Sequence, residues 1–470
     1  MNVDSKQLLM LLTSASLLVG LFCLIRLAGP DCRRLKQLSS SRGRLHENVG
    51  KKNRTLEGVI PLLFPVKPLV FWNTDYHATP ISDLADFLRP FGVRVLDKNF
   101  DWSRCAIFGN CAGRSTLRVI KHDNALGVDD PALVGRFQAE YRDDEEMKSV
   151  DAFVCFHPAA ICELYVPFNK SIVVIATTRY NLARFESDRW THWNEVLTGI
   201  AAGPANVVAA NNLYDAEYIR HFTGIDARVL PSNCGYVFNL TYNQTRPGYL
   251  LGNTRNRVIL EYFKSEFSRS CADLATTSSS CPPALLVGVY DKYPFPNLQF
   301  SDIIAHAGIV HLPYQVSVMS LFEQYRMNVP LFCPSERLLF EWQLRFEAMN
   351  ERAARPALLG WPLDPTAPRP NGSVIAAHPS QRGVPDPNDE IHPAAIRHWI
   401  QFADYLQWPH ITRFDTVDEL VRLLMTLTPA DLRRISDRMR THNAQVRAEL
   451  VDEWRNILVK IARHSSNQPH

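Results

Sequence analysis

Short hydrophobic runs alternate with amphipathic segments through the first half of the chain. Apolar runs bounded by polar turns are typical of buried strands, and apolar residues three or four positions apart are typical of helices. Their alternation predicts a parallel sheet with right-handed helical crossovers. The helix ending near Phe222 has Asn211 or Asn212 as its expected N-cap and Gly224 as its expected C′ residue. The predicted strands are 69–72, 93–96, 152–156, 172–176, 207–210 and 229–230, and the predicted helices are 81–88, 159–164, 190–200 and 211–222.

A second alternating set follows a turn-rich segment at 231–247, which we interpret as a linker between two domains. The pattern beyond the linker predicts a second parallel sheet. The chain is therefore expected to be an α/β protein with two facing Rossmann-like domains. The predicted strands are 249–251, 285–289, 309–312 and 330–333, and the predicted helices are 301–308, 317–328, 417–424, 429–439 and 444–461.

Two segments of the second half differ from this alternation. Residues 355–393 are proline-rich and polar, and so long a stretch is usually a functional loop or disordered. The helix predicted at 444–461 carries one apolar stripe and is expected to cross back toward the first domain. The stripe consists of Val446, Leu450, Trp454, Leu458 and Ile461.

An uncharged apolar run extends from Leu8 to Ile25. A bilayer span needs about 20 apolar residues, so we expect a signal-anchor helix of a single-pass type II membrane protein, with a cleaved signal peptide as the alternative. The polar, basic residues after it predict a flexible stem. The expected divisions are 1–28 for a cytosolic tail and anchor, 29–61 for the stem, 62–235 for an N-terminal domain, 246–430 for a C-terminal domain and 431–470 for C-terminal helices.

Sequons and cysteines bear on the side of the membrane that the body occupies. The basic residues after the anchor would place it in the cytosol by the positive-inside rule. N-x-S/T sequons and close cysteine pairs instead favour an oxidising lumen, so we expect a lumenal glycoprotein of the Golgi or ER membrane. Free thiols are the alternative for the pairs, and Cys155 and Cys333 are expected to be buried thiols. The sequons are Asn53, Asn169, Asn239, Asn243 and Asn371, and the cysteine pairs are Cys105 with Cys111 and Cys271 with Cys281.

Composition limits the size class and the partners. The 470 residues suggest two or three domains, and 46% hydrophobic residues can form a large core. Lysine and arginine (51) nearly balance aspartate and glutamate (48), and no basic block stands out. Nucleic acid is therefore not expected as a partner.

The segment from His311 to Pro330 carries the richest set of polar candidates. Its pattern is strand, tight loop, helix and strand, and ligands of open α/β sheets bind beyond the carboxyl ends of the strands. Ser317 is the expected N-cap, and the helix start would offer free N–H groups to a diphosphate. Ser320 and Glu323 lie away from the apolar stripe, so Glu323 can accept hydrogen bonds from ribose hydroxyls or, alternatively, face solvent. The stripe consists of Val318, Leu321, Phe322 and Tyr325.

Residues 285–335 resemble the nucleotide-binding half of GT-B-fold glycosyltransferases, in particular the retaining family-4 enzymes. In that family a helix glutamate holds the donor ribose and a proline opens the next strand; Glu323 and Pro330 have the same spacing. The family's first glutamate falls at Gln315, which leaves the stereochemistry open. The resemblance implies a GT-B architecture, with an N-terminal acceptor domain and a C-terminal donor domain. The expected donor-binding residues in this segment are Glu323, Ser317, Ser320 and Tyr314.

Loops after other predicted strands point to the same cleft. Arg255 follows a glycine turn and can pair with phosphate, or lie solvated in an ordinary turn. Lys292 is a candidate contact to base or sugar. Inverting GT-B enzymes can use a histidine in the similar first-domain loop as the base, so His77 or Asp75 is the candidate catalytic base; a surface histidine and a capping aspartate are the alternative. Arg179 is a candidate contact to the acceptor or a phosphate.

A resident metal or cofactor is not expected. The run Asp143–Glu146 is similar to the acidic motif of the metal-dependent GT-A fold, but no apolar strand precedes it, which favours a solvated loop. The predicted function is sugar transfer from a nucleotide-sugar donor to a glycan, protein or lipid acceptor in the secretory pathway. The alternatives are a GT-B-fold sugar-nucleotide epimerase and a non-catalytic glycan-binding protein.

Overall fold

The computed structural model describes residues 68–75, 78–98, 117–120, 131–180, 184–275, 281–282, 284–294, 297–349 and 369–466. The expected anchor at 8–25 and the stem fall outside the described residues, as do Asn53, His77, Cys105 and Cys111. Among the described helices, none is both long and apolar enough to cross a membrane.

The first domain contains a six-stranded sheet in which every strand pair is parallel. The strand order is β2-β1-β3-β4-β5-β6, so the direction of winding reverses between β1 and β3. Each predicted strand of this half is confirmed within a few residues. The strands are β1 (Val70–Thr74), β2 (Arg94–Asp97), β3 (Ala152–Cys155), β4 (Ser171–Ala176), β5 (Val207–Ala210) and β6 (Arg228–Val229).

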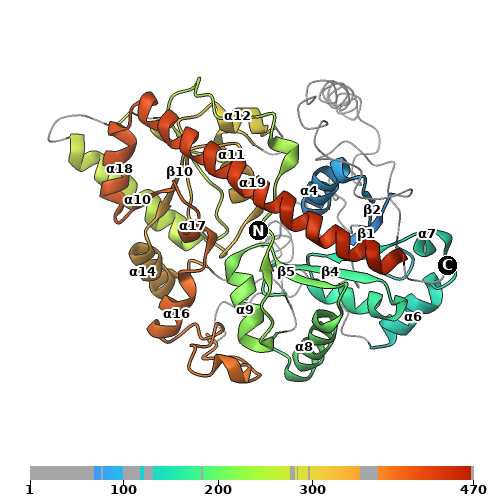
Figure 1. Ribbon diagram of the computed structural model, residues 1–470. Coiled ribbons are helices and arrows are strands. Elements are labelled where there is room, and N and C mark those ends of the chain that lie inside the picture. Colours follow the sequence, from blue (N-terminus) through green and yellow to red (C-terminus); the bar gives the residue numbers. More distant parts are fainter. Residues whose placement is uncertain are drawn as a thin grey trace, which may run out of the picture.

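The helices of the first domain cover both faces of this sheet (Figure 1). Asn212 caps α9 by accepting the Asp215 N–H, and Gly224 follows the helix with φ +72°, so both predicted caps are confirmed. The predicted helix at 159–164 is instead the 3-10 segment η2. The elements are α4 (Ala78–Leu88), η1 (Arg89–Phe91), α6 (Pro131–Tyr141), α7 (Glu145–Lys148), η2 (Ala159–Phe168), α8 (Ser187–Ala202) and α9 (Leu213–Thr223).

The second domain contains a five-stranded parallel sheet in the order β11-β10-β9-β7-β8. Here too the winding reverses between the first and third strands, β7 and β9. The predicted strands are confirmed, whereas β11 was not predicted. The strands are β7 (Tyr249–Leu251), β8 (Leu286–Gly288), β9 (Ile309–Val310), β10 (Leu331–Pro334) and β11 (Thr412–Phe414).

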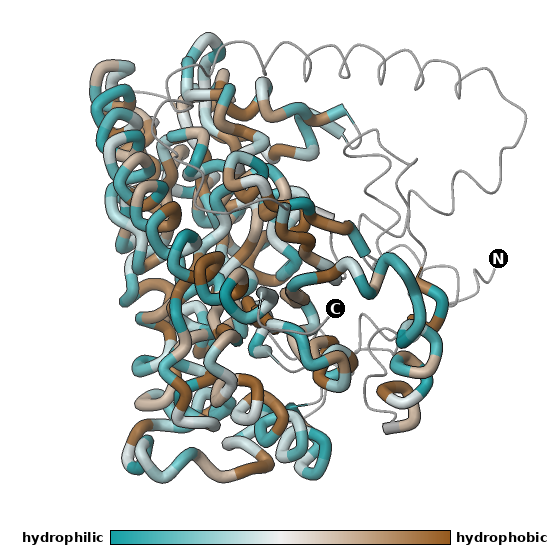
Figure 2. Tube along the Cα trace, turned by 45° about the vertical axis from the view of Figure 1, so that its right-hand side comes forward, coloured by the Kyte–Doolittle hydropathy of each residue, from teal (hydrophilic) through white to brown (hydrophobic). Residues whose placement is uncertain are grey.

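The helices of the second domain include α10, α14 and α16, which were not predicted from the sequence. Hydrophobic residues gather inside both domains, and hydrophilic residues lie on the outer helices (Figure 2). The elements are α10 (Arg257–Ala275), α11 (Val289–Lys292), α12 (Phe300–Ile304), α13 (Met319–Arg326), α14 (Glu336–Phe346), α16 (Pro393–Ile400), α17 (Asp404–Gln407) and α18 (Val417–Thr426), with the 3-10 turns η3 (Gly235–Val237) in the linker and η4 (Pro379–Gln381).

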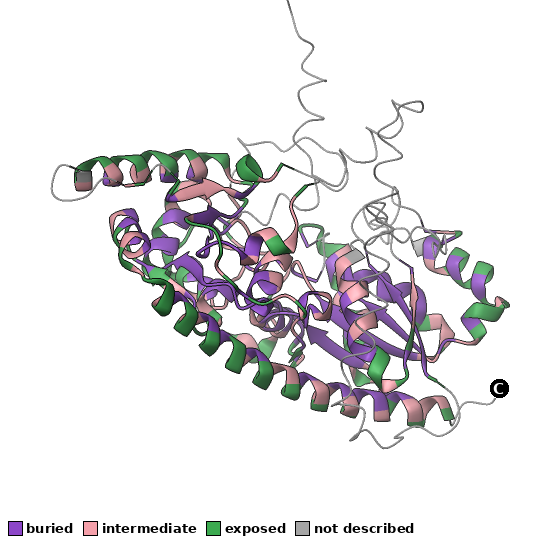
Figure 3. Ribbon diagram, turned by 90° about the horizontal axis from the view of Figure 1, so that it is seen from above, coloured by how far each residue is buried: buried purple, intermediate pink, exposed green. Residues whose placement is uncertain are grey.

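One helix, α19 (Pro429–Ser466), runs along both domains (Figure 1). The sequence pattern predicts two helices with a break after Met439, and this prediction is wrong, because α19 is one helix of 38 residues. The residues at the expected break include neither proline nor glycine, so nothing in them interrupts the helix. Leu432 and Met439 join the core cluster that contains the second sheet. Figure 3 shows that the side of α19 that faces the domains is buried and that its outer side is exposed. The predicted crossing to the first domain is confirmed, because Leu450, Trp454, Leu458 and Ile461 pack against the first sheet.

The described part of the predicted excursion, from residue 369 onward, packs onto helix α9 of the first domain. The Tyr218 hydroxyl donates to Asn388 Oδ1 over 2.8 Å, and the His378 N–H donates to the His221 carbonyl over 2.8 Å. The Trp399 ring centroid lies 5.5 Å from that of Tyr214. This segment is therefore an ordered connection between the domains, so the disordered alternative is wrong for it.

Two disulfides lie in the described residues. Cys271 and Cys281 are joined, as their spacing predicted. The prediction for Cys155 as a free buried thiol is wrong: it bonds Cys162, because η2 folds back against the end of β3 and brings the two Cα atoms to 5.8 Å. Cys333 is a free buried thiol. Four sequon asparagines are described, and all are exposed: Asn169, Asn239, Asn243 and Asn371.

Candidate functional site

The winding reversal of the second sheet brings the loops after β7 and β9 together at its carboxyl edge. Such a switch point is where open α/β sheets bind ligands. Gly252 begins the first of these loops. A Cβ there would lie 3.3 Å from the Val310 carbonyl oxygen and 3.4 Å from His311 Nδ1, so a larger residue would press on the second loop.

His311 is buried at this point and holds helix α13. Its Nε2 lies 2.5 Å from Gln324 Oε1, an oxygen that accepts, so Nε2 carries the proton. Burial lowers the pKa of His311 to about 4, which keeps the ring neutral. His311 therefore acts as a fixed hydrogen-bonding strut between β9 and α13.

The predicted capping role of Ser317 is wrong. Helix α13 begins at Met319, with Val318 as an N-cap that makes no side-chain cap hydrogen bond. The Ser317 side chain instead forms a hydrogen bond with the carboxyl group of Asp404. The backbone N–H of Asp404 in turn donates to the Val316 carbonyl over 3.0 Å. Asp404 is 2% exposed, and burial raises its pKa to about 7. A carboxylate from α17 thus fixes the loop that precedes α13.

Glu323 lies on α13 opposite the buried stripe and faces the linker. The Tyr236 hydroxyl donates to its Oε1 over 2.8 Å. Glu323 is half-buried, and this burial raises its pKa to about 7. The linker therefore partly covers Glu323, and its role in binding a donor stays a prediction. The predicted stripe is confirmed, since the buried residues include Val318, Leu321, Phe322 and Tyr325.

Arg255 and Tyr314 lie on loops near Glu323, and Tyr290 lies nearby on helix α11. The Arg255 guanidinium is 5.6 Å from the Tyr314 ring centroid. Burial raises the pKa of Tyr290, Glu323 raises it further and Arg255 lowers it, so these three groups lie within electrostatic reach of one another. Lys292 is placed differently: its ammonium is 5.9 Å from the Tyr293 ring and lowers the pKa of His306 together with burial.

Asp75 lies at the switch point of the first sheet. Its side chain is fully buried, and Oδ2 accepts the His157 N–H over 3.1 Å, which ties the loop after β1 to the loop after β3. The neighbouring Thr74 belongs to a buried cluster in which Trp72 Nε1 donates to both Thr74 Oγ1 and the Tyr165 hydroxyl, each over 3.1 Å. The roles of Asp75 and His77 as a base stay predictions.

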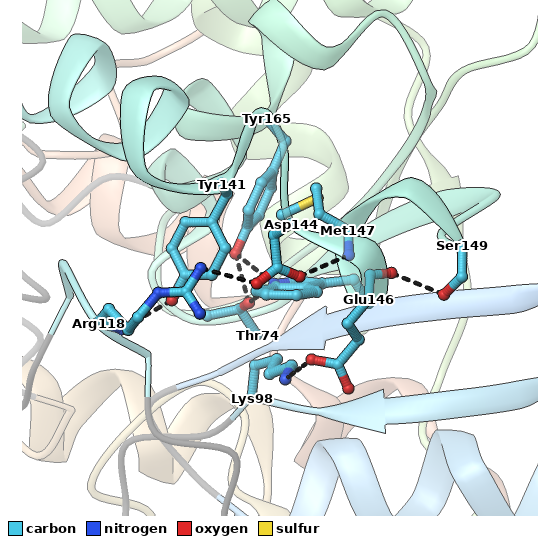
Figure 4. A network of polar contacts seen from close by, with 10 residues as sticks. Thr74, Lys98, Arg118, Tyr141, Asp144, Glu146, Met147, Ser149 and Tyr165 are labelled. Carbon is cyan, nitrogen blue, oxygen red and sulfur yellow. Dashed lines mark hydrogen bonds and ion pairs between the residues drawn. The ribbon is translucent and has the colours of Figure 1, made fainter.

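The acidic run after α6 is a capped helical turn rather than the predicted solvated loop. Asp144 caps α7 by accepting the Met147 N–H over 3.0 Å and pairs with Arg118 over 2.8 Å. Glu146 pairs with the buried Lys98 over 2.6 Å (Figure 4). Among the described residues, no three histidine, cysteine, aspartate or glutamate side chains are grouped as metal ligands would be.

Arg179 is buried at the carboxyl end of β4. Its Nε and Nη2 donate to the two carboxylate oxygens of Asp215 over 2.7 and 3.1 Å. Thr178, Arg179 and Tyr180 all have left-handed φ angles, of 53°, 59° and 42°, a conformation that costs free energy and that this ion pair helps to hold. Arg179 and Asp215 both influence the pKa of Asp404 on α17, so the carboxyl end of β4 lies within electrostatic reach of the second domain.

No family model and no curated protein matches the chain. Similar solved structures include the glycosyltransferase of kitacinnamycin, with 13% sequence identity, a match that covers 85% of this chain and 98% of that chain, and a TM-score of 0.34. Another is the glycosyltransferase SnogD from Streptomyces nogalater, with 12% identity, a match that covers 83% of this chain and 100% of that chain, and a TM-score of 0.39. A third is a UDP-glucosyltransferase from Polygonum tinctorium, with 10% identity, a match that covers 86% of this chain and 100% of that chain, and a TM-score of 0.42. The chain has a mixed α/β fold with two parallel sheets, and their strand orders are consistent with the GT-B arrangement.

Proposed function

We propose that the protein is a glycosyltransferase that moves a sugar from a nucleotide-sugar donor to an acceptor hydroxyl. The observation that carries the proposal is Glu323, a half-buried carboxylate beside the switch point of the second sheet. An ionised carboxylate accepts hydrogen bonds from two vicinal hydroxyls, which is the chemistry of a ribose. The likeness of the Glu323–Pro330 spacing to the family-4 enzymes supports the same assignment.

The charges and rings around Glu323 suit the rest of a donor. Arg255 is exposed and can pair with a diphosphate, and the Tyr314 ring beside it offers an apolar face to a base or sugar. Gly252 allows the backbone of the same loop to approach the ligand closely. We assign Ser317 an indirect role, because its side chain bonds Asp404, and we place Lys292 outside the donor site.

The first domain is proposed to bind the acceptor. Asp75 or His77 would then remove the proton from the attacking hydroxyl. If either is the base, Asp75→Asn or His77→Ala should lower the transfer rate by roughly 10²–10⁴ while donor binding changes little. Because Asp75 also ties two loops together, its variant needs a thermal melt as a folding control. Full activity in both variants would exclude this loop from the chemistry.

We further propose that the protein works in the secretory pathway, anchored by residues 8–25 and without a resident metal. The exposed sequons and the Cys271–Cys281 disulfide support an oxidising lumen. The acceptor would then be a glycan, protein or lipid of that compartment.

Titration with nucleoside diphosphates and a donor-hydrolysis screen test the proposal together. Full-length protein is titrated with the diphosphates of uridine, guanosine, adenosine and cytidine, and is then incubated with the corresponding nucleotide-sugars. Binding with release of free sugar or transfer to an acceptor supports a glycosyltransferase. Binding of glycans with no affinity for any diphosphate would instead identify a lectin-like protein, and epimerised nucleotide-sugar would identify an epimerase.

A further inference from the structure

Residues 232–237 of the linker are held by side chains of both domains. Asp83 on α4 accepts the N–H groups of Asn233 over 2.8 Å and Gly235 over 3.2 Å. From the second domain, Arg326 on α13 donates to the Ser232 carbonyl from Nε over 3.3 Å and from Nη2 over 3.2 Å. The backbone of this segment is therefore fixed on both sides, and so is the direction of the side chain that follows Gly235.

That side chain is Tyr236, the central residue of η3. Its hydroxyl donates to Glu323 Oε1 over 2.8 Å, and its ring centroid lies 6.3 Å from that of Phe300 on α12. Burial raises the pKa of Tyr236 well above its ordinary value, so the hydroxyl keeps its proton and remains a donor. Within the described residues, the Glu323 carboxylate accepts this hydrogen bond through Oε1. Its other oxygen, Oε2, can therefore accept a hydrogen bond from a ligand.

We propose that Tyr236 is a positioning residue of the donor site: its hydroxyl fixes Oε1 of Glu323 so that Oε2 is directed to the ribose hydroxyls of a ribonucleoside diphosphate sugar. This inference rests on the function proposed above. It makes the linker part of the machinery that distinguishes ribose from deoxyribose, although Tyr236 itself does not touch the donor.

Electrostatics gives the same contact a second consequence. Burial raises the pKa of Glu323, the Tyr236 hydrogen bond lowers it, and Asp83 raises it. The other groups facing Glu323 are Tyr290 on α11 and Cys234 in the linker, both of which it influences. Removing the hydroxyl should therefore raise the pKa of Glu323. As pH falls, the carboxylate is protonated and ribose affinity declines, and in the variant this decline should begin at a higher pH than in the wild type.

The test compares Tyr236→Phe with Tyr242→Phe. Tyr242 is a buried tyrosine of the same linker segment whose hydroxyl donates to the Ala307 carbonyl over 3.2 Å, so its variant removes an equivalent hydroxyl outside the donor site. The probes are the four ribonucleoside diphosphates and the 2′,3′-dideoxy form of whichever the wild type binds. Thermal melts report folding for every variant.

Tyr236→Phe should weaken binding of the ribonucleotide about three- to tenfold and change binding of the dideoxy form less than about twofold. Tyr242→Phe should bind both like the wild type. In a double variant with Glu323→Ala, the loss of the Tyr236 hydroxyl should have no further effect, because the acceptor of its hydrogen bond has already been removed. The midpoint of the pH profile for ribonucleotide affinity should rise in Tyr236→Phe.

The outcomes separate the two levels of the proposal. If the folded wild type binds none of the four diphosphates, the proposed function fails and this inference fails with it. If Glu323→Ala abolishes ribose preference while Tyr236→Phe retains both the preference and the wild-type pH profile, only the positioning role of Tyr236 is wrong.

Discussion

At the scale of single residues, Glu323 is the one on which the proposed donor site depends most directly. Glu323→Ala should weaken nucleoside diphosphate binding about ten- to a hundredfold, because hydrogen bonds to a charged acceptor are lost. Glu323→Gln keeps one acceptor and should lose less. Isothermal titration of both variants gives the affinities, and unchanged melting curves would show that the fold survives. An alanine variant that is folded and binds as tightly as the wild type would place the donor elsewhere.

Asp404 makes a prediction about stability. Burial raises its pKa from 3.8 to about 7, with Asp215 raising it and Ser317, Arg179 and Arg326 lowering it. Its folded pKa therefore exceeds the unfolded one, so its contribution to stability is complete below the unfolded pKa and is lost as pH rises through about 7. Asp404→Asn cannot ionise and should melt progressively higher relative to the wild type as pH rises over that range. Parallel melting curves at every pH would contradict the raised pKa.

Residues found by sequence spacing and residues found only in the structure differ in how they act. Glu323 and its apolar stripe follow from helical periodicity and the position of Pro330, which are local patterns. Tyr236 and Asp404 act through contacts with residues far away in sequence, and nothing in their own segments marks them. Ser317 was assigned to the helix cap because the sequence gives no sign of Asp404, its actual partner.

At the scale of elements, predictability follows burial and length. Strands β3, β4 and β5 are buried at every position, and each was predicted from an unbroken apolar run. Strand β11 spans three residues, of which Phe414 alone is buried, so no run of the required length exists. The 3-10 segment η2 was mistaken for an α-helix because its apolar spacing is similar, although Pro167 lies inside it.

Helix α19 carries the second stability prediction. Trp454 is 3% exposed and packs with Leu450 and Leu458 against the first sheet. Trp454→Ala should lower the free energy of unfolding by about 3–5 kcal/mol through loss of buried surface and formation of a cavity. Asn456→Ala, at an exposed position of the same helix, is the matched control and should change little. Denaturant titration measures both, and equal effects would mean that the helix does not support the first domain.

At the scale of the whole molecule, the described residues contain three connections between the domains: the linker, helix α19 and the segment from residue 369 onward. The segment from residue 369 onward places Asn388 and His378 against α9. If the domains moved relative to one another, these contacts would have to break or the segment would have to move with the first domain. The sequence indicated two domains and one crossing helix. It did not indicate the third connection, because its proline-rich composition is also typical of disordered chain.

The compartment can be tested on the intact protein. Protein made in animal cells should lose mass on treatment with a glycosidase, because Asn169, Asn239, Asn243 and Asn371 are all exposed. Replacing these four asparagines with glutamine should remove the shift that they contribute. A chain that carries no glycan and is digested by protease added from the cytosolic side would support the orientation favoured by the basic residues after the anchor.

The path of α19 also determines when the first domain can be completed. The sheet face that contains Phe71, Val154 and Val173 is covered by α19 residues from Leu450 onward, and these follow the entire second domain in the chain. A ribosome releases the N-terminal part first, so the part of this face that α19 occupies must remain uncovered while about two hundred further residues are made, at roughly 5–20 per second. The nascent first domain thus has a window of tens of seconds in which a chaperone would have to shield the surface that α19 later occupies.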